Sequence, residues 1–380
     1  MRILYFSRDY TTHDYRFLTA LAKTNHRVFY LRLEGGGQVL EDRPLPPEIA
    51  QVEWAGGHQP AKLRDGVHLF DDLRRVIRQV KPDLIHAGPV QRSAFLVALA
   101  GFHPLVSVSW GYDLLHDAQI NPFWHWATRY TLHHSDAFVG DCDTIRKLAV
   151  SYGMPDERIV TFPWGIDLAH FNLPTQTCID RSLIDEPSPA SIGFRSMNVP
   201  TFNLLSTRSW EPIYGIDVIA RAFVIAARKR PQLRLTLLAN GSQLVPIRQI
   251  LLIGDVYDQV LFPGQVSYSD LPSYYRNADL YISASHSDGT SISLLEAFGC
   301  GTPAIVPDIP GNQEWITPGE NGWLFSDGDA EALASAILNA MDQRQNLPEM
   351  GRKARLLAEA RADWQKNFTQ LEKAYAIALG

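Results

Sequence analysis

Short apolar runs rich in β-branched and aromatic residues alternate along the chain with segments in which apolar residues recur at helical spacing. This alternation is typical of βαβ units and predicts parallel sheets. Strands are expected in the first half at residues 2–6, 27–33, 83–86, 105–109, 137–139 and 158–162. Helices are expected between them at 15–23, 67–80, 92–100, 122–134 and 144–152.

The second half repeats this rhythm. Strands are expected at residues 203–206, 234–239, 260–262, 280–283, 303–306 and 323–325, and helices at 216–229, 271–277, 293–298 and 330–342. Residues 172–200 are rich in proline and serine without clear periodicity, which indicates a linker. We therefore expect an α/β lobe at 1–171, a linker at 172–200, a second lobe at 201–360, and a final helix from about 361 to 379. That helix could end the second lobe or return to the first.

Composition and charge narrow the class of protein. The 380 residues are 46% hydrophobic and 20% charged, which describes an ordinary globular chain of two domains. The net charge of −6 gives no basic field, so nucleic acid is not an expected partner. No apolar run approaches the ~20 residues of a membrane span, and the first residues do not resemble a signal peptide. Three separate cysteines form no metal-binding or disulfide pattern, so we expect a cytoplasmic protein.

Residues 285–303 are the most informative stretch. They follow a predicted strand, turn at Asp288-Gly289 and enter a helix, at the strand end where open α/β sheets bind ligands. The backbone N–H groups at the helix start would favour a phosphate; they belong to Thr290, Ser291, Ile292 and Ser293. Glu296, one turn further on, could accept hydrogen bonds from a ribose diol. The alternative is a solvated glutamate after a serine-capped turn.

Several ordered motifs resemble the retaining GT-B glycosyltransferases of family 4. Asp288 and Glu296 are separated by seven residues and followed by AFGCGTP and PGNQEW, similar to the E-x7-E segment of that family. The segments RIVTFPWGIDLAHF at 158–171 and ENGWLF at 320–325 are also similar, in the family's order. The motifs that carry the resemblance lie within residues 80–345. The first 80 residues match the family only in their pattern of expected strands and helices.

The resemblance implies two Rossmann-like lobes facing across a cleft, with transfer in that cleft. The C-terminal lobe would hold a nucleotide-diphosphate sugar and the N-terminal lobe the acceptor. By carry-over, Glu296 binds the ribose hydroxyls, and Asp288 contacts hydroxyls of the donor sugar beside Gly289. The chain departs from the family where Asp288 replaces a glutamate and where Thr290 and Ser291 replace an aromatic residue and a glycine.

A second matching loop, residues 206–217, follows the first strand of the second lobe. In the family it commonly supplies an arginine and a lysine that neutralise the leaving diphosphate. Arg208 matches the arginine, whereas Tyr214 stands near the position of the lysine, with one extra residue between. Tyr214 could donate to the phosphates or only pack. The alternative for Arg208 is a surface residue beside a turn.

Candidate residues of the first lobe follow its strands. Trp110 occupies the place of a histidine that the family presents to the donor sugar, which leaves Asp113 as a candidate catalytic residue or a helix cap. The predicted acceptor-site residues are Arg8, His13, Asp14, His86 and Arg92. Asp14 could instead start a helix, and a lone loop histidine is more often without a catalytic role.

Metal ligands are absent in any persuasive spacing, so neither a metal nor another cofactor is expected. The aromatic segment 123–130 could meet a membrane surface or lipid acceptor, although core packing is the more common role. A basic face of helix 67–80 shares its surface with acidic residues and is expected to be solvated.

These observations predict a cytoplasmic, metal-independent, retaining glycosyltransferase in surface polysaccharide or glycolipid synthesis, peripheral to the membrane if it contacts lipid. The implied mechanism is front-face attack, in which the leaving phosphate takes the acceptor proton. The alternatives are a related enzyme with a small soluble acceptor, such as a sugar phosphate, and a non-catalytic nucleotide-sugar-binding protein. A dehydrogenase is disfavoured because no GxGxxG follows the first strand.

Overall fold

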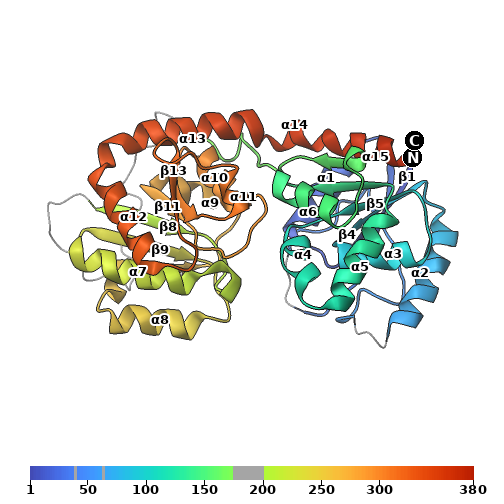
Figure 1. Ribbon diagram of the computed structural model, residues 1–380, viewed down its shortest axis with the longest axis horizontal. Helices are drawn as coiled ribbons and strands as arrows, with labels where there is room; N and C mark the ends of the chain where they lie inside the picture. The colour runs from blue at the N-terminus through green and yellow to red at the C-terminus, as the bar shows by residue number, and fades with distance from the viewer. Residues whose placement is uncertain (38–40, 62–64, 174–200) are drawn as a thin grey trace. The chain divides into compact units, whose positions relative to one another are not determined.

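The chain forms two compact α/β units. The computed structural model describes residues 1–37, 41–61, 65–173 and 201–380, so the predicted linker lies outside the described residues from residue 174 onward. Unit 1 comprises Met1–Trp164, Asp288–Thr290 and Gln365–Gly380, and unit 2 comprises Gly165–Ser287 and Ser291–Trp364. Each unit contains one parallel sheet with helices on both faces (Figure 1), which confirms the two predicted Rossmann-like lobes.

The sheet of unit 1 has the strand order β3-β2-β1-β4-β5-β6-β7, and every pair in it is parallel. Its strands are β1 (Arg2–Ser7), β2 (Arg27–Arg32), β3 (Ala50–Gln51), β4 (Leu84–Gly88), β5 (Leu105–Val108), β6 (Ala137–Gly140) and β7 (Ile159–Thr161). The central strands are buried on both faces, which is why they read as continuous apolar runs.

Alternate residues of these strands pack against helices on opposite faces of the sheet. Leu4 and Phe6 of β1 share a core with α2 and α3, while Tyr5 stacks on His86 and faces α1 and α15. The helices are α1 (Thr12–Ala22), α2 (Gly66–Val80), α3 (Phe95–Leu99), α4 (Tyr112–Leu115), α5 (Pro122–His133), α6 (Asp143–Ser151) and α15 (Gln370–Leu379). The C-terminal helix α15 therefore packs on the sheet of unit 1.

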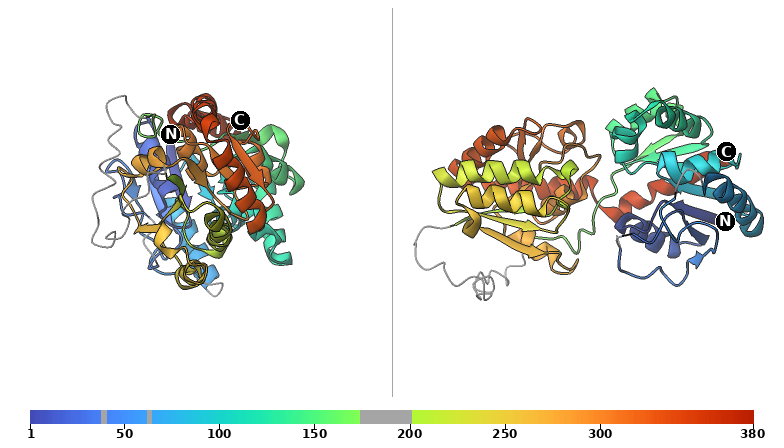
Figure 2. Two further views of the ribbon diagram at one scale, coloured as in Figure 1. Left: turned by 90° about the vertical axis from the view of Figure 1, so that its left-hand side faces the viewer. Right: turned by 90° about the horizontal axis from the view of Figure 1, so that it is seen from below.

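The sheet of unit 2 has the strand order β10-β9-β8-β11-β12-β13 and is also parallel throughout. Its strands are β8 (Phe202–Ser206), β9 (Leu233–Leu238), β10 (Val260–Gly264), β11 (Leu280–Ile282), β12 (Ala304–Pro307) and β13 (Gly322–Phe325). One face packs against α7 (Ile216–Lys229), α8 (Leu244–Ile253) and α12 (Ala330–Asp342). The other packs against α9 (Leu271–Asn277), α10 (Ile292–Gly299) and α13 (Leu347–Arg361), as Figures 1 and 2 show.

The sequence prediction missed three features of this arrangement. Strand β3 is only two exposed residues long, too short for an apolar pattern. Helix α8, which is not among the expected helices, has Pro246 in its first turn, where proline is tolerated. The single helix expected at 361–379 is wrong, because the chain breaks at Ala362-Asp363, where Asp363 pairs with Ile166, and continues as α14 (Trp364–Phe368) and then α15.

In each sheet the strand order reverses direction at the first strand of the unit, and polar loops follow the strands at this point. In unit 1, β1 lies between β2 and β4, and in unit 2, β8 lies between β9 and β11. Open parallel sheets bind ligands at the carboxyl ends of the strands at such a switch point. In unit 2 this location brings together the loops that follow β8 and β11. Separately, no helix in the described ranges has the length and apolar character needed to span a membrane.

Gly215 allows the loop after β8 to approach the end of β11. Its φ is +60°, and a Cβ atom there would lie 2.2 Å from the carbonyl oxygen of Ala284. Both features favour glycine, because other residues strain at positive φ and the carbonyl oxygen occupies the space that a Cβ needs. The loop that carries Arg208 therefore depends on this position.

We expect Gly215→Ala to lower the free energy of unfolding by roughly 2–4 kcal/mol, the sum of a positive-φ penalty and overpacking. Chemical unfolding followed by circular dichroism measures the loss. Gly319→Ala is the matched control, because its φ is +79° and no atom lies within 4 Å of its added Cβ. Equal losses in the two variants would show that the contact with Ala284 carries no strain.

Candidate active site

The arginine predicted to meet the diphosphate lies at the start of α10. Arg208 follows β8 by one residue, and its Nη1 lies 3.3 Å from Ser291 Oγ and 3.2 Å from Ser293 Oγ. Ser291 is the N-cap residue of α10, and its side chain makes no capping hydrogen bond. The guanidinium therefore lies beside backbone donors that no cap side chain satisfies, which concentrates positive potential at the switch point of unit 2.

Tyr214 orients Arg208. It ends the single 3-10 turn Pro212–Tyr214, and the Cζ atom of Arg208 lies 4.2 Å from the centroid of its ring. A guanidinium over an aromatic face is held by cation–π attraction and by flat stacking. This contact shows how tyrosine can serve at a position near the expected lysine: it fixes the direction of the one arginine.

Glu296 is buried in the same site and is held by a tyrosine that the sequence analysis did not single out. Its Oε2 accepts a hydrogen bond of 2.9 Å from the hydroxyl of Tyr275, which also lies 3.0 Å from Thr207 Oγ1. Burial raises the pKa of Tyr275 well above its usual value, so this hydroxyl remains a donor at physiological pH. Glu296 is therefore not the solvated glutamate of the alternative reading, and its predicted role toward a ribose stays a prediction.

A second tyrosine supports the helix start. The hydroxyl of Tyr281, in β11, donates to Ser293 Oγ over 2.7 Å. Neither tyrosine carries a local sequence signal, because both lie in apolar segments that predict core packing. Only their long-range contacts with α10 identify them.

Asp288, Gly289 and Thr290 belong to unit 1 and pack near Asp141, which follows β6. The backbone N–H of Thr290 donates to Asp141 Oδ2 over 2.7 Å, and its Oγ1 donates to the Asp141 carbonyl over 2.9 Å. A Cβ at Gly289 would lie 2.6 Å from Asp141 Oδ2, so a larger residue there would displace the Asp141 side chain. Burial raises the pKa of Asp141 to about 7, and the nearby charge of Asp288 adds to this rise.

Asp113 lies inside unit 1, where it links two strand ends. Its Oδ2 accepts from the backbone N–H of Val90 over 3.0 Å and its Oδ1 from Ser109 Oγ over 2.6 Å. Burial raises its pKa to about 6. It lies in the first turn of α4, for which Gly111 is the N-cap, so it does not cap that helix. Its predicted role toward substrate stays a prediction, and the contacts indicate positioning of the loops after β4 and β5.

The predicted acceptor residues occupy two kinds of place. Asp14 forms a capping box with Thr11 at the start of α1, as its structural alternative anticipated. His86 is fully buried, with Nδ1 2.9 Å from the Tyr375 hydroxyl, and burial lowers its pKa to about 3. It is therefore a neutral core residue.

The other three candidates remain near the carboxyl edge of the sheet. The side chains of Arg8 and Arg92 approach opposite oxygens of Glu34, at 3.0 and 4.0 Å. The ring of His13 stacks on Trp110 with centroids 5.3 Å apart. These residues line the loops after β1, β2, β4 and β5, where the acceptor was predicted to bind.

Within the described ranges, no group of three or more histidine, cysteine, aspartate or glutamate side chains could hold a metal ion. The polar groups that converge on the start of α10 are one guanidinium, serine hydroxyls and backbone N–H groups.

Several solved structures share this fold along almost the whole chain. HepE from Anabaena in complex with UDP is 16% identical, with a TM-score of 0.77, over 99% of this chain and 100% of that one. Sucrose-phosphate synthase from Thermosynechococcus elongatus is 17% identical, with a TM-score of 0.78, over 99% and 98%. HepE has also been solved with UDP-glucose. At this identity the likeness shows the GT-B fold, which confirms the expected fold class.

Curated relatives are also glycosyltransferases. A D-inositol 3-phosphate glycosyltransferase from Pseudarthrobacter chlorophenolicus is 27% identical over 237 residues, which are 61% of this chain and 53% of the relative. An alpha-monoglucosyldiacylglycerol synthase from Streptococcus pneumoniae is 29% identical over 210 residues, 55% of this chain and 45% of the relative. The chain thus spans about half the length of these relatives.

Two family models cover most of the chain and confirm the resemblance that the motifs indicated. "Glycosyltransferase Family 4" matches residues 11–170, and "Glycosyl transferases group 1" matches residues 199–376, which include Arg208 and Glu296. The chain belongs to the group 1 glycosyltransferases.

Proposed function

We propose that this chain is a retaining, metal-independent transferase that moves a sugar from a nucleotide-diphosphate donor to an acceptor hydroxyl. Unit 2 binds the donor and unit 1 contributes the acceptor-binding residues. The observation that carries this proposal is the position of Arg208 against Ser291 and Ser293 at the start of α10, with Glu296 one turn further along that helix.

This arrangement suits the two ends of a nucleoside diphosphate. A guanidinium and the N–H groups of a helix N-terminus commonly bind phosphate oxygens. The negative charge of a diphosphate would balance the positive charge that they supply. A carboxylate such as that of Glu296 can accept hydrogen bonds from both hydroxyls of a ribose. The complexes of HepE with UDP and with UDP-glucose support a nucleotide-sugar donor and make UDP sugars the first to test.

The proposed reaction proceeds on one face of the donor sugar. The bond between the anomeric carbon and the phosphate oxygen breaks, the acceptor oxygen bonds to the same carbon, and the acceptor proton passes to the departing phosphate. Arg208 and the start of α10 stabilise the negative charge that grows on the leaving group. Asp288 contacts donor-sugar hydroxyls, while Asp113 and Asp141 hold the loops of unit 1.

We further propose that the acceptor is a growing glycan or glycolipid of a surface polymer. The alpha-monoglucosyldiacylglycerol synthase relative supports a lipid-linked acceptor, and the D-inositol 3-phosphate relatives support a small soluble one as the alternative. Arg8 and Arg92 both approach Glu34. These two arginines could bind an anionic group on either kind of acceptor.

A ligand screen followed by product analysis tests this function. Thermal shift against UDP, GDP, ADP, TDP and CMP sugars should identify one nucleotide that raises the melting temperature by mass action. Incubation of that donor with acceptor hydroxyl compounds should give a product whose anomeric configuration, measured by NMR, matches the donor. Binding without any transfer or nucleotide release would favour a non-catalytic binding protein.

Removal of divalent cations should leave turnover unchanged, because Arg208 and the start of α10 supply the charge stabilisation that a cation would otherwise provide. Nucleotide release measured with and without EDTA tests this point. Activity lost with EDTA and restored by Mg²⁺ or Mn²⁺ would contradict the metal-free assignment.

Glu296→Ala should weaken nucleotide binding by roughly 1.5–3 kcal/mol, the range for hydrogen bonds to a charged group. Tyr275→Phe should weaken it by roughly 0.5–1.5 kcal/mol, because the carboxylate remains but loses the donor that orients it. Calorimetric titration measures both. Glu331→Ala, at an exposed position of α12, is the control. Unaltered affinity in Glu296→Ala would mean that this glutamate has only a structural role.

Arg208→Ala should lower turnover by a factor equivalent to roughly 3–4 kcal/mol and weaken donor binding less, because the phosphate gains charge in the transition state. Tyr214→Ala should reproduce part of this loss, whereas Tyr214→Phe should keep near-normal turnover because it retains the ring. The matched control is Arg248→Ala, which removes an arginine stacked on Phe262 elsewhere in unit 2. Near-normal turnover in a folded Arg208→Ala variant would refute the leaving-group role.

A further inference from the structure

Helix α5 buries its small side chains and exposes its large ones. The buried face consists of Ala127, Thr128, Thr131 and Leu132, whereas Phe123 is 44% exposed and Trp126 is 48% exposed. A helix on the surface of a globular protein normally turns its large apolar residues toward the core. The sequence analysis favoured core packing for this aromatic segment, and for Phe123 and Trp126 the exposure contradicts it.

These exposed rings are fixed rather than loose. Phe95 of α3 contacts the rings of Phe123, Trp126 and Tyr130, with centroids 6.2, 5.6 and 6.1 Å away. We refer to these four residues as the aromatic platform. Ile120, which precedes the N-cap of α5 and is 53% exposed, extends its apolar surface. The platform is therefore a preformed apolar surface that needs little ordering to bind a partner.

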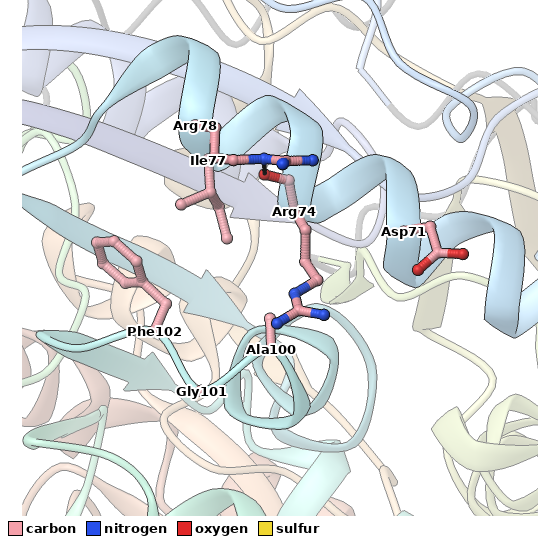
Figure 3. A pocket seen from close by; sticks show the side chains of 7 residues that line it. All are labelled: Asp71, Arg74, Ile77, Arg78, Ala100, Gly101 and Phe102. Atoms are coloured by element: carbon pink, nitrogen blue, oxygen red, sulfur yellow. Dashed lines mark hydrogen bonds between the residues drawn. The ribbon is translucent and has the colours of Figure 1, made fainter.

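Arginines flank the platform. Arg74 and Arg78 of α2 line an open hollow of 570 Å³ together with Phe102, which follows α3. Figure 3 shows the Arg74 side chain extending toward Ala100 at the end of α3, while Asp71 points away along the helix. Figures 1 and 2 show α5, α3 and α2 side by side, so the helices that carry the platform and the hollow are neighbours.

The hollow carries two arginines and one carboxylate, Asp71. Arg74, Arg78 and Arg129 form no ion pair with any described carboxylate, although nearby Arg75 is paired with Asp72. Residues 118–135, which include all of α5, contain no aspartate or glutamate. An apolar platform on a surface where arginines exceed carboxylates is complementary to an apolar partner that carries negative charge at its surface.

We propose that the face formed by α2, α3 and α5 docks on an anionic lipid membrane surface. Phe123, Trp126 and Ile120 insert at the level where acyl chains meet headgroups, a position that aromatic side chains favour. Arg74 and Arg78 bind lipid phosphates from the hollow. A second copy of this chain fits less well, because a symmetric interface would set the same arginines against each other. This inference goes beyond the proposed transferase function and does not depend on it.

Co-sedimentation of the full chain with vesicles tests the proposal. Binding is expected to vesicles of phosphatidylglycerol and phosphatidylcholine and to be much weaker to phosphatidylcholine alone. The double variant Phe123→Ser, Trp126→Ser should lower the partition coefficient about tenfold or more, because its inserted apolar area is lost. Arg74→Gln with Arg78→Gln should lower it roughly thirtyfold, at the strength of one surface-bound arginine each.

The matched control is Leu252→Ser with Ile253→Ser on α8, whose side chains are 59% and 84% exposed near Asp255 and Asp258. It should bind vesicles like the wild type. All variants alter exposed side chains, and unchanged melting temperatures would confirm their folding.

Absence of binding to the anionic vesicles, or binding that is lost in the α8 control but kept in the α5 variant, would overturn the proposal. So would a dimer in sedimentation that the α5 variant dissociates while vesicle binding persists, because the platform would then be a protein interface.

Discussion

The guanidinium of Arg208 is the group on which the proposed donor site depends. It stacks on the ring of Tyr214 and donates hydrogen bonds to Ser291 and Ser293 at the start of α10. A single arginine with several rotatable bonds is a poor electrostatic catalyst unless its direction is fixed before substrate binds. Here the fixing groups come from two parts of unit 2, the loop after β8 and the start of α10, so the strand order that places β8 beside β11 also builds the site.

Much of the fold was predictable because its signals are local. Apolar runs gave the long strands, and the Asn121-Pro122 capping pattern gave the start of α5. The partners of site residues were not predictable, because they depend on tertiary contact. Tyr275 lies 21 positions from Glu296, in the separate short helix α9, and Asp141 lies 149 positions from Thr290. No spacing rule connects residues so far apart.

The departures from the family motifs acquire a physical meaning in the structure. Tyr214 near the usual position of a lysine gives up one positive charge and gains an oriented arginine. Thr290 and Ser291, which replace an aromatic residue and a glycine, contact Asp141 and Arg208 respectively. These substitutions leave the helix start at α10 as the shared element of the site, which is why we assign the phosphates to it.

A comparison of three ligands tests this assignment most directly. Calorimetric titration would measure the affinities of the nucleoside, its monophosphate and its diphosphate for wild type and for Arg208→Ala, with the base that the screen identifies. If Arg208 and α10 hold the phosphates, affinity should rise at each added phosphate in the wild type, and the variant should lose most of the rise while its nucleoside affinity is unchanged. An equal rise in the two proteins would contradict the account.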